Sequence, residues 1–114
     1  YGELHARILR ILTCFGYGLP DCRVWRYWDN GQPVKTEGAP AKTLVMARRG
    51  KALIAVASYG PAGEVRLTLD TRELGLAETA AAVNAETGEP VERAADGSFT
   101  LPLPRHDFRL LSIQ

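Results

Sequence analysis

The stretch EVRLTLD, residues 64–70, is the clearest guide to the fold. Its side chains alternate between apolar and polar, with Val65, Leu67 and Leu69 in one set and Arg66 and Thr68 in the other. Successive side chains of a β-strand point to opposite faces of the sheet, so this period of two places each set on its own face. The stretch therefore predicts a strand with one face in a core and the other in solvent.

Similar short segments surround this strand. We predict them at residues 43–49, 52–59, 80–85, 90–93, 98–103 and 107–113. Gly50-Lys51 and Ala95-Asp96-Gly97 are typical of hairpin turns, and Pro102 places its strand at a sheet edge. Residues 52–57 are apolar on both faces, which is typical of a central strand. Thr71–Gly75 is predicted to be a single helical turn, with Thr71 as N-cap and Gly75 as terminator. About seven short strands with frequent turns favour a mainly β fold, an antiparallel β-sandwich.

The front of the chain follows a helical pattern. An apolar stripe at helical spacing predicts one amphipathic helix over residues 2–15. The residues of the stripe are Leu4, Ile8, Ile11, Leu12 and Phe15, and those on the other side of the helix are Glu3, Arg7 and Arg10. A lone helix of this length is marginal in water, so we expect the stripe to pack partly on a neighbour outside this chain.

Lys35–Lys42 is expected to be a loop. The predicted organisation is a helix with a connecting segment at 1–42, then a β-sandwich at 43–114.

Composition narrows the range of functions. The chain has 114 residues and a net charge of +1, from 14 basic and 13 acidic residues. This balance argues against a nucleic-acid partner, and the absence of a run of about 18 apolar residues argues against a membrane span. The chain starts at Tyr1 rather than Met, and we expect it to be a piece or a mature form of a longer protein.

Cys14 and Cys22 allow three interpretations: a disulfide, a metal site completed by His5 and His106, or two buried thiols. The third is favoured, because free cysteine is usually buried and no CxxC or HxxxH pairing supports a metal. We expect no cofactor and no metal. No GxSxG, P-loop or GxGxxG pattern is present.

The remaining charged residues favour structural roles. Glycoside hydrolysis needs two carboxylates about 5–10 Å apart, and the acids to consider are Asp21, Asp29 and Glu37. Solvated loop acids are the favoured interpretation, with Asp29 forming an Asx-type turn. The basic tip at residues 48–51 is interpreted as a solvated loop rather than a site for an anionic polymer. Asp107 and Arg109 predict a cross-strand salt bridge, and His106 has no partner at catalytic spacing.

The order of several motifs resembles a known family. They are YWDNGQPV at 27–34, KALIAVA at 51–57, VRLTLD at 65–70, LGL at 74–76, NAETG at 84–88 and RHDFRLL at 105–111. This order resembles the C-terminal end of bacterial glycoside hydrolases of the family 123-like group, in which a (β/α)8 barrel precedes a small β-sandwich. The resemblance implies that the helix is the last helix of the barrel or a linker. It also implies that the catalytic acids lie upstream, so we expect no catalytic residue here.

Three functions are weighed on this basis. The first is a non-catalytic accessory domain that packs against the preceding catalytic barrel and stabilises it. The second is a carbohydrate-binding module with exposed aromatics, and the third is a stand-alone interaction domain. The candidate ligand-binding residues are Trp25, Tyr27 and Trp28, since aromatic faces suit sugar rings. Anchoring helix to sandwich is the favoured role of this cluster, ahead of a surface platform or a loop that reaches the substrate cleft. We expect Trp25 and Tyr27 to share one strand face, with Trp28 on the other.

Overall fold

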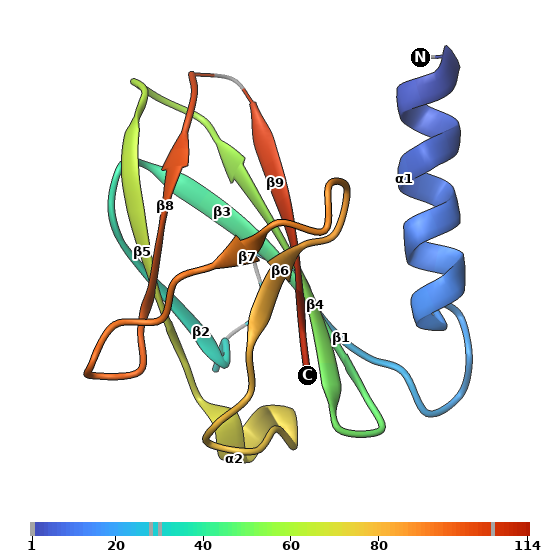
Figure 1. Cartoon of the computed structure of the whole chain (residues 1–114). Helices are drawn as coiled ribbons and strands as arrows, with labels where there is room; N and C mark the ends of the chain where they lie inside the picture. Colours follow the sequence, from blue (N-terminus) through green and yellow to red (C-terminus); the bar gives the residue numbers. More distant parts are fainter. Residues whose placement is uncertain (1, 28, 30, 106) are drawn as a thin grey trace.

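The computed structural model describes residues 2–27, 29, 31–105 and 107–114, and residues 2–5 by their backbone alone. Figure 1 shows one long helix beside two antiparallel sheets. The six-stranded sheet has the order β1-β3-β4-β9-β6-β7, and the three-stranded sheet has the order β2-β5-β8. The elements are α1 (Gly2–Phe15), β1 (Arg23–Trp25), β2 (Val34–Gly38), β3 (Ala41–Arg48), β4 (Lys51–Ser58), β5 (Gly63–Leu69), α2 (Thr71–Leu74), β6 (Ala82–Asn84), β7 (Pro90–Val91), β8 (Phe99–Leu103) and β9 (Phe108–Ile113). The predicted fold class, a mainly β antiparallel sandwich with one N-terminal helix, is confirmed.

Two strands, β1 and β2, come from the segment that was expected to connect helix and sandwich. The predicted loop at 35–42 is wrong, because β2 pairs with β5 from Val34↔Leu69 to Gly38↔Val65. Gly38 has a φ of +98°, and a β-carbon there would lie 2.4 Å from the carbonyl oxygen of Glu64. Only glycine allows this close approach without strain. Both sheets thus take strands from residues before position 43, and the division at residue 42 remains a prediction about domain organisation.

The two predicted hairpins have different outcomes. The β3–β4 hairpin is confirmed, with Arg49 and Gly50 at positive φ of 49° and 78°, as a type I′ turn requires. Lys51 already belongs to β4, which lies centrally between β3 and β9 as predicted. The hairpin around residues 95–97 is wrong: β7 pairs with β6, β8 pairs with β5, and only the bridge Arg93↔Phe99 joins the flanks. The turn is present, but the chain there crosses from one sheet to the other.

Two smaller predictions concern β8 and α2. Strand β8, which contains Pro102, lies at a sheet edge as predicted. Gly75 ends α2 in the left-handed conformation as predicted, but the N-cap is Asp70 rather than Thr71. The Asp70 carboxylate accepts a hydrogen bond from the backbone N–H of Glu73, 3.1 Å away, because its side chain lies one residue before the helical turn.

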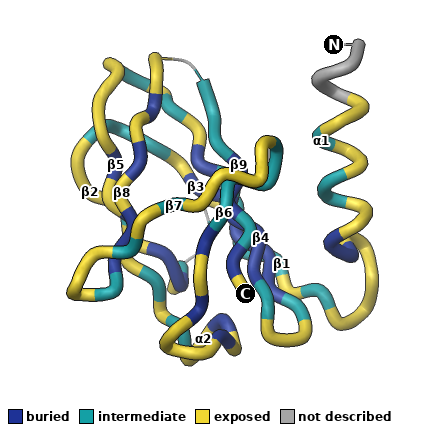
Figure 2. The backbone as a smooth tube through the Cα atoms, in the orientation of Figure 1, coloured by how far each residue is buried: buried dark blue, intermediate teal, exposed yellow. Residues whose placement is uncertain are grey.

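The main core lies between the two sheets. Its fully buried side chains include Val45, Ile54, Leu67, Phe99 and Ile113. The predicted inward set of β5 is confirmed for Val65 and Leu67, which are buried, and Leu69 is half-buried. Figure 2 shows the dark, buried segments between the sheets and the exposed yellow segments at the edges and loops.

Helix α1 forms a third layer on the outer face of the six-stranded sheet (Figure 1). Phe15 is 6% exposed and packs with Met46 and Leu53, and Ile11 and Leu12 pack against the same cluster. These three residues of the stripe pack within the chain, because β3 and β4 present apolar side chains on both faces. Ile8 is half-buried, and the expectation that part of the stripe packs on a neighbour outside this chain remains a prediction. Leu4 lies outside the described side chains.

Candidate functional site

The predicted aromatic cluster is split between the two faces of the six-stranded sheet. Trp25, in β1, is half-buried and packs against the main core, with the Arg23 guanidinium 5.1 Å from its ring centroid. Tyr27 is 54% exposed. The two do not share a strand face, because β1 ends at Trp25. Trp28 lies outside the described residues. Trp25 therefore packs between the two sheets and not against α1, which covers the other face, so the expected anchoring of helix to sandwich is wrong for Trp25. A ligand-binding role for the cluster remains a prediction.

Tyr27 is joined by two residues that sequence reasoning missed. The Lys42 ammonium lies 4.4 Å from the ring centroid of Tyr27 and 5.1 Å from that of Tyr59. Lys42 pairs with Ala57 in the β3–β4 ladder. The turn at Arg49 and Gly50 fixes this register, so the hairpin signal could have placed Lys42 beside the end of β4. No local sequence pattern predicts that Tyr27 lies beside Lys42.

A groove adjoins these side chains on the outer face of the sheet. It has a volume of about 370 Å³, and its lining residues are Tyr17, Arg26, Tyr27, Lys42, Thr43, Leu44, Ala55 and Ala57. The small side chains of Ala55 and Ala57 leave this part of the sheet hollow. Two of the described lining residues are cationic and none is acidic. The groove can therefore bind a ligand with an apolar face and a negative charge, but it contains no general acid.

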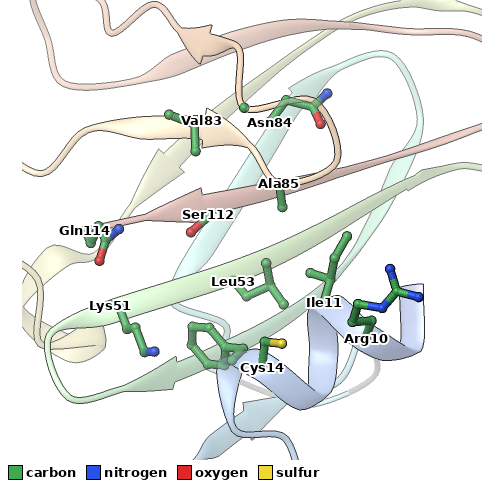
Figure 3. A pocket seen from close by; sticks show the side chains of 12 residues that line it. Arg10, Ile11, Cys14, Lys51, Leu53, Val83, Asn84, Ala85, Ser112 and Gln114 are labelled. Atoms are coloured by element: carbon green, nitrogen blue, oxygen red, sulfur yellow. The ribbon is translucent and has the colours of Figure 1, made fainter. Parts of the chain in front are cut away.

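A second groove, of about 420 Å³, runs between α1 and the sheet. Figure 3 shows Leu53 and Ser112 on its floor, with Ile11 and Cys14 on the helix side and Ala85 across from them. No Asp, Glu or His is among the described residues that line it. It offers a thiol and cationic side chains, without a carboxylate or imidazole to activate a nucleophile.

Both cysteine thiols are free. The favoured interpretation of two buried thiols is right that the thiols are unpaired but wrong about burial, because Cys14 is exposed and Cys22 is of intermediate exposure. Cys22 is half-buried against the Met46 and Leu53 cluster, and burial raises the pKa of its thiol. In the described part of the chain, no three His, Cys, Asp or Glu side chains could together hold a metal ion. His106 and the side chain of His5 lie outside the described residues.

The candidate acids have structural partners. Asp21 accepts hydrogen bonds from Nε of both Arg48 and Arg49, each at 2.8 Å. The bond from Arg48 is the largest reason why the pKa of Asp21 lies below its usual value, with Arg49 adding to the effect and burial opposing it. A general acid in glycoside hydrolysis needs the opposite shift.

Asp29 and Glu37 also fit the favoured structural interpretation. Asp29 accepts a hydrogen bond from the backbone N–H of Arg26 at 2.7 Å, while its own N–H donates to the Arg26 carbonyl at 2.9 Å. Asp29 is thus a turn residue, but its carboxylate bonds back to Arg26, which is not the Asx-type turn that was expected. Glu37 is exposed on β2. The three candidate acids thus lie apart in structural roles: Asp29 in a turn, Asp21 in an ion-pair cluster and Glu37 on a strand.

The basic tip at residues 48–51 and the Asp107–Arg109 pair both differ from expectation. The basic tip at Arg48 and Arg49 is held by Asp21 instead of being simply solvated. Asp107 and Arg109 form an ion pair of 3.0 Å within one chain segment rather than across strands. The Phe108 backbone N–H is the largest reason why the pKa of Asp107 is lowered, and Arg109 contributes as well. Neither strand next to β9 supplies the expected partner.

The comparisons with known proteins give one match. A family model described as "Glycoside hydrolase 123, C-terminal domain" matches residues 10–100, about four fifths of the chain. No curated protein and no solved structure matches. No described helix is both long and apolar enough to cross a membrane.

Proposed function

Because the chain belongs to the family of glycoside hydrolase 123 C-terminal domains, we propose that it packs against the catalytic barrel of the same enzyme and stabilises it without taking part in catalysis. Resemblance to this family had implied such a role from the sequence. Ile11, Leu12 and Phe15 of the α1 stripe already pack within the chain, so we look for the docking surface among the exposed apolar residues.

The distribution of exposed apolar side chains carries this proposal. Among the described residues, five large apolar side chains are exposed, and four of them lie between positions 9 and 27: Leu9 49%, Tyr17 55%, Leu19 46% and Tyr27 54%. Leu9 belongs to α1, Tyr17 and Leu19 to the segment that connects α1 to β1, and Tyr27 follows β1. Single exposed apolar residues are ordinary, but a gathering of them on one layer is typical of a protein contact.

The outer surface of a barrel is suited to pack against helix α1. A (β/α)8 barrel has an outer ring of helices, and one helix packs its ridges into the grooves of another. Helix α1 packs Ile11, Leu12 and Phe15 on the sheet and leaves Leu9 toward solvent. It can thus be shared between the sandwich and a barrel helix. We name Leu9, Tyr17 and Leu19 the docking surface.

The test uses a complete glycoside hydrolase that carries this chain as its C-terminal domain. The double variant Leu9→Lys/Leu19→Lys places two charges in the docking surface. We expect a lower unfolding midpoint of the catalytic domain and faster inactivation on heating, with the sandwich itself still folded by circular dichroism.

The control adds the same charge to the opposite side of the molecule. Thr68 and Thr100 are exposed on the outer face of the three-stranded sheet, and Thr68→Lys/Thr100→Lys should leave the catalytic domain as stable as in the wild type. If both double variants lower its midpoint equally, or neither does, the docking surface is not where we propose.

A further inference from the structure

Tyr27, Lys42 and Tyr59 form a surface cluster outside the core. The groove beside them meets the docking surface at Tyr17, which lines it, but contains neither Leu9 nor Leu19. They come from the segment after β1, from β3 and from the residue after β4. Both rings are more than half exposed, at 54% and 57%, and the Lys42 ammonium lies between them within 4.4 and 5.1 Å of their centroids. Exposed rings of this kind contribute little to folding, since most of their surface remains in water.

Hydrogen bonds fix the backbone at both tyrosines. Tyr27 lies inside the turn that Asp29 closes on Arg26, with backbone and side-chain bonds of 2.9 and 2.7 Å. The Tyr59 N–H donates to the Pro40 carbonyl at 3.3 Å, and the Ser58 hydroxyl donates to the Gly60 carbonyl at 3.1 Å. When the backbone of a site is fixed before binding, less conformational entropy is lost as the ligand binds.

The shape next to the cluster suits a small ligand. The groove of about 370 Å³ has Leu44, Ala55 and Ala57 among its lining residues, beside Tyr27 and Lys42. Its volume falls within the range of about 300–1,000 Å³ that is usual for small-molecule sites. A sugar ring has one apolar face that can lie on a tyrosine ring, and hydroxyls that reach polar groups at the rim.

The charge of the site selects among sugars. No ion pair joins Lys42 to a carboxylate in the described part of the chain, and the only charged residues among those lining the groove are Lys42 and Arg26. The hydroxyls of a neutral sugar seated there would replace the water around the Lys42 ammonium with uncharged acceptors only. A carboxylate or sulfate on the sugar would supply a charge-assisted partner.

We propose that the Tyr27–Lys42–Tyr59 cluster binds an anionic saccharide, with a sugar ring stacked on a tyrosine and its carboxylate or sulfate at the Lys42 ammonium. The saccharide class rests on membership of a glycoside hydrolase family, while the site itself does not depend on docking to a barrel. The cluster differs from the predicted aromatic set, since Trp25 packs against the core and Tyr59 and Lys42 take part.

The test titrates the chain with four probes by calorimetry and by NMR: trigalacturonate, a sulfated galactose oligosaccharide of the same length, neutral galactotriose and inorganic sulfate. We expect saturable binding of at least one anionic saccharide, at least tenfold tighter than that of galactotriose or of sulfate alone. The two anionic probes decide between a carboxylate and a sulfate. Equal binding of neutral and anionic sugars, equal binding of sulfate alone, or no saccharide binding would each overturn the proposal.

Matched variants test the named residues. Lys42→Gln and Tyr59→Ala should each weaken binding at least tenfold, whereas Tyr59→Phe keeps the ring and should retain it. Lys35→Gln removes an exposed charge from β2 and should bind as the wild type does. Equal losses in Lys42→Gln and Lys35→Gln would show a general charge effect and contradict the site. Leu9→Lys/Leu19→Lys should bind the saccharide normally, so failure of docking and failure of this site are separate results.

Discussion

The carboxylate of Asp21 accepts a hydrogen bond from the guanidinium of Arg48, with 2.8 Å between Oδ1 of Asp21 and Nε of Arg48. Asp21 lies in the segment after α1, and Arg48 is the last residue of β3. Arg49 binds the second carboxylate oxygen at the same distance. This cluster thus fastens the segment that follows α1 to the β3–β4 hairpin, close to where Phe15 packs on the sheet.

Stability in acid should depend on Asp21. Its pKa is lowered in the folded chain, so its contribution is complete above the ordinary value of 3.8 and is lost as the pH falls through the folded value. We expect the free energy of unfolding of Asp21→Asn to fall less than that of the wild type between pH 5 and pH 2, measured by urea denaturation.

The same change in an Arg48→Gln/Arg49→Gln background provides the control. Without the two guanidinium groups, Asp21→Asn should no longer alter the acid dependence, because the cause of the pKa shift is gone. An unchanged effect of Asp21→Asn in that background would contradict the assignment.

Phe15 should decide whether α1 stays on the sheet. It is 6% exposed and covers Met46 and Leu53, and truncation of a buried phenylalanine costs about 3–5 kcal/mol. We expect Phe15→Ala to increase the binding of a hydrophobic dye and to reduce the helical signal in circular dichroism. Leu9→Ala, on the same helix but 49% exposed, should change the free energy of unfolding by no more than about 0.5 kcal/mol. Equal effects of the two variants would mean that α1 packs through another face.

The pair Leu67 and Phe99 tests the register between β5 and β8. The two residues are directly paired and both are fully buried, so Leu67→Ala should cost about 2–5 kcal/mol and Phe99→Ala about 3–5 kcal/mol. Arg66 lies on the opposite face and bonds the exposed Asp96 and the buried Ser98. Because the Ser98 hydroxyl also bonds Asp96, Arg66→Ala should cost about 0.5 kcal/mol. Chemical denaturation measures all three. Similar losses for Leu67→Ala and Arg66→Ala would place the wrong face in the core.

The chain by itself should hydrolyse no glycoside. Asp21 is held ionised by two arginines, and Asp29 closes a turn, so neither is set up as the acid of a carboxylate pair. Incubation with a panel of aryl glycosides and oligosaccharides should give turnover no faster than buffer. Turnover that disappears in Asp29→Asn or Glu37→Gln would contradict this expectation.

The sequence by itself determined the elements whose patterns are local and strong. The helix over residues 2–15, the strand around Leu67 and the β3–β4 hairpin were all predictable, because helical spacing, alternation and a glycine turn act within a few residues. The mainly β sandwich and the resemblance to glycoside hydrolase family 123 followed from the order of these short motifs.

The tertiary structure decided which elements meet. The strand at Val34–Gly38 forms because β5 offers it a free edge, and the turn at 95–97 does not make a hairpin because its flanks are taken by different sheets. Tyr27 and Tyr59 are far apart in the chain and meet only where β3 places Lys42 between them. Such contacts join distant segments through the packing of a whole sheet, and a local pattern carries no information about partners that distant in sequence.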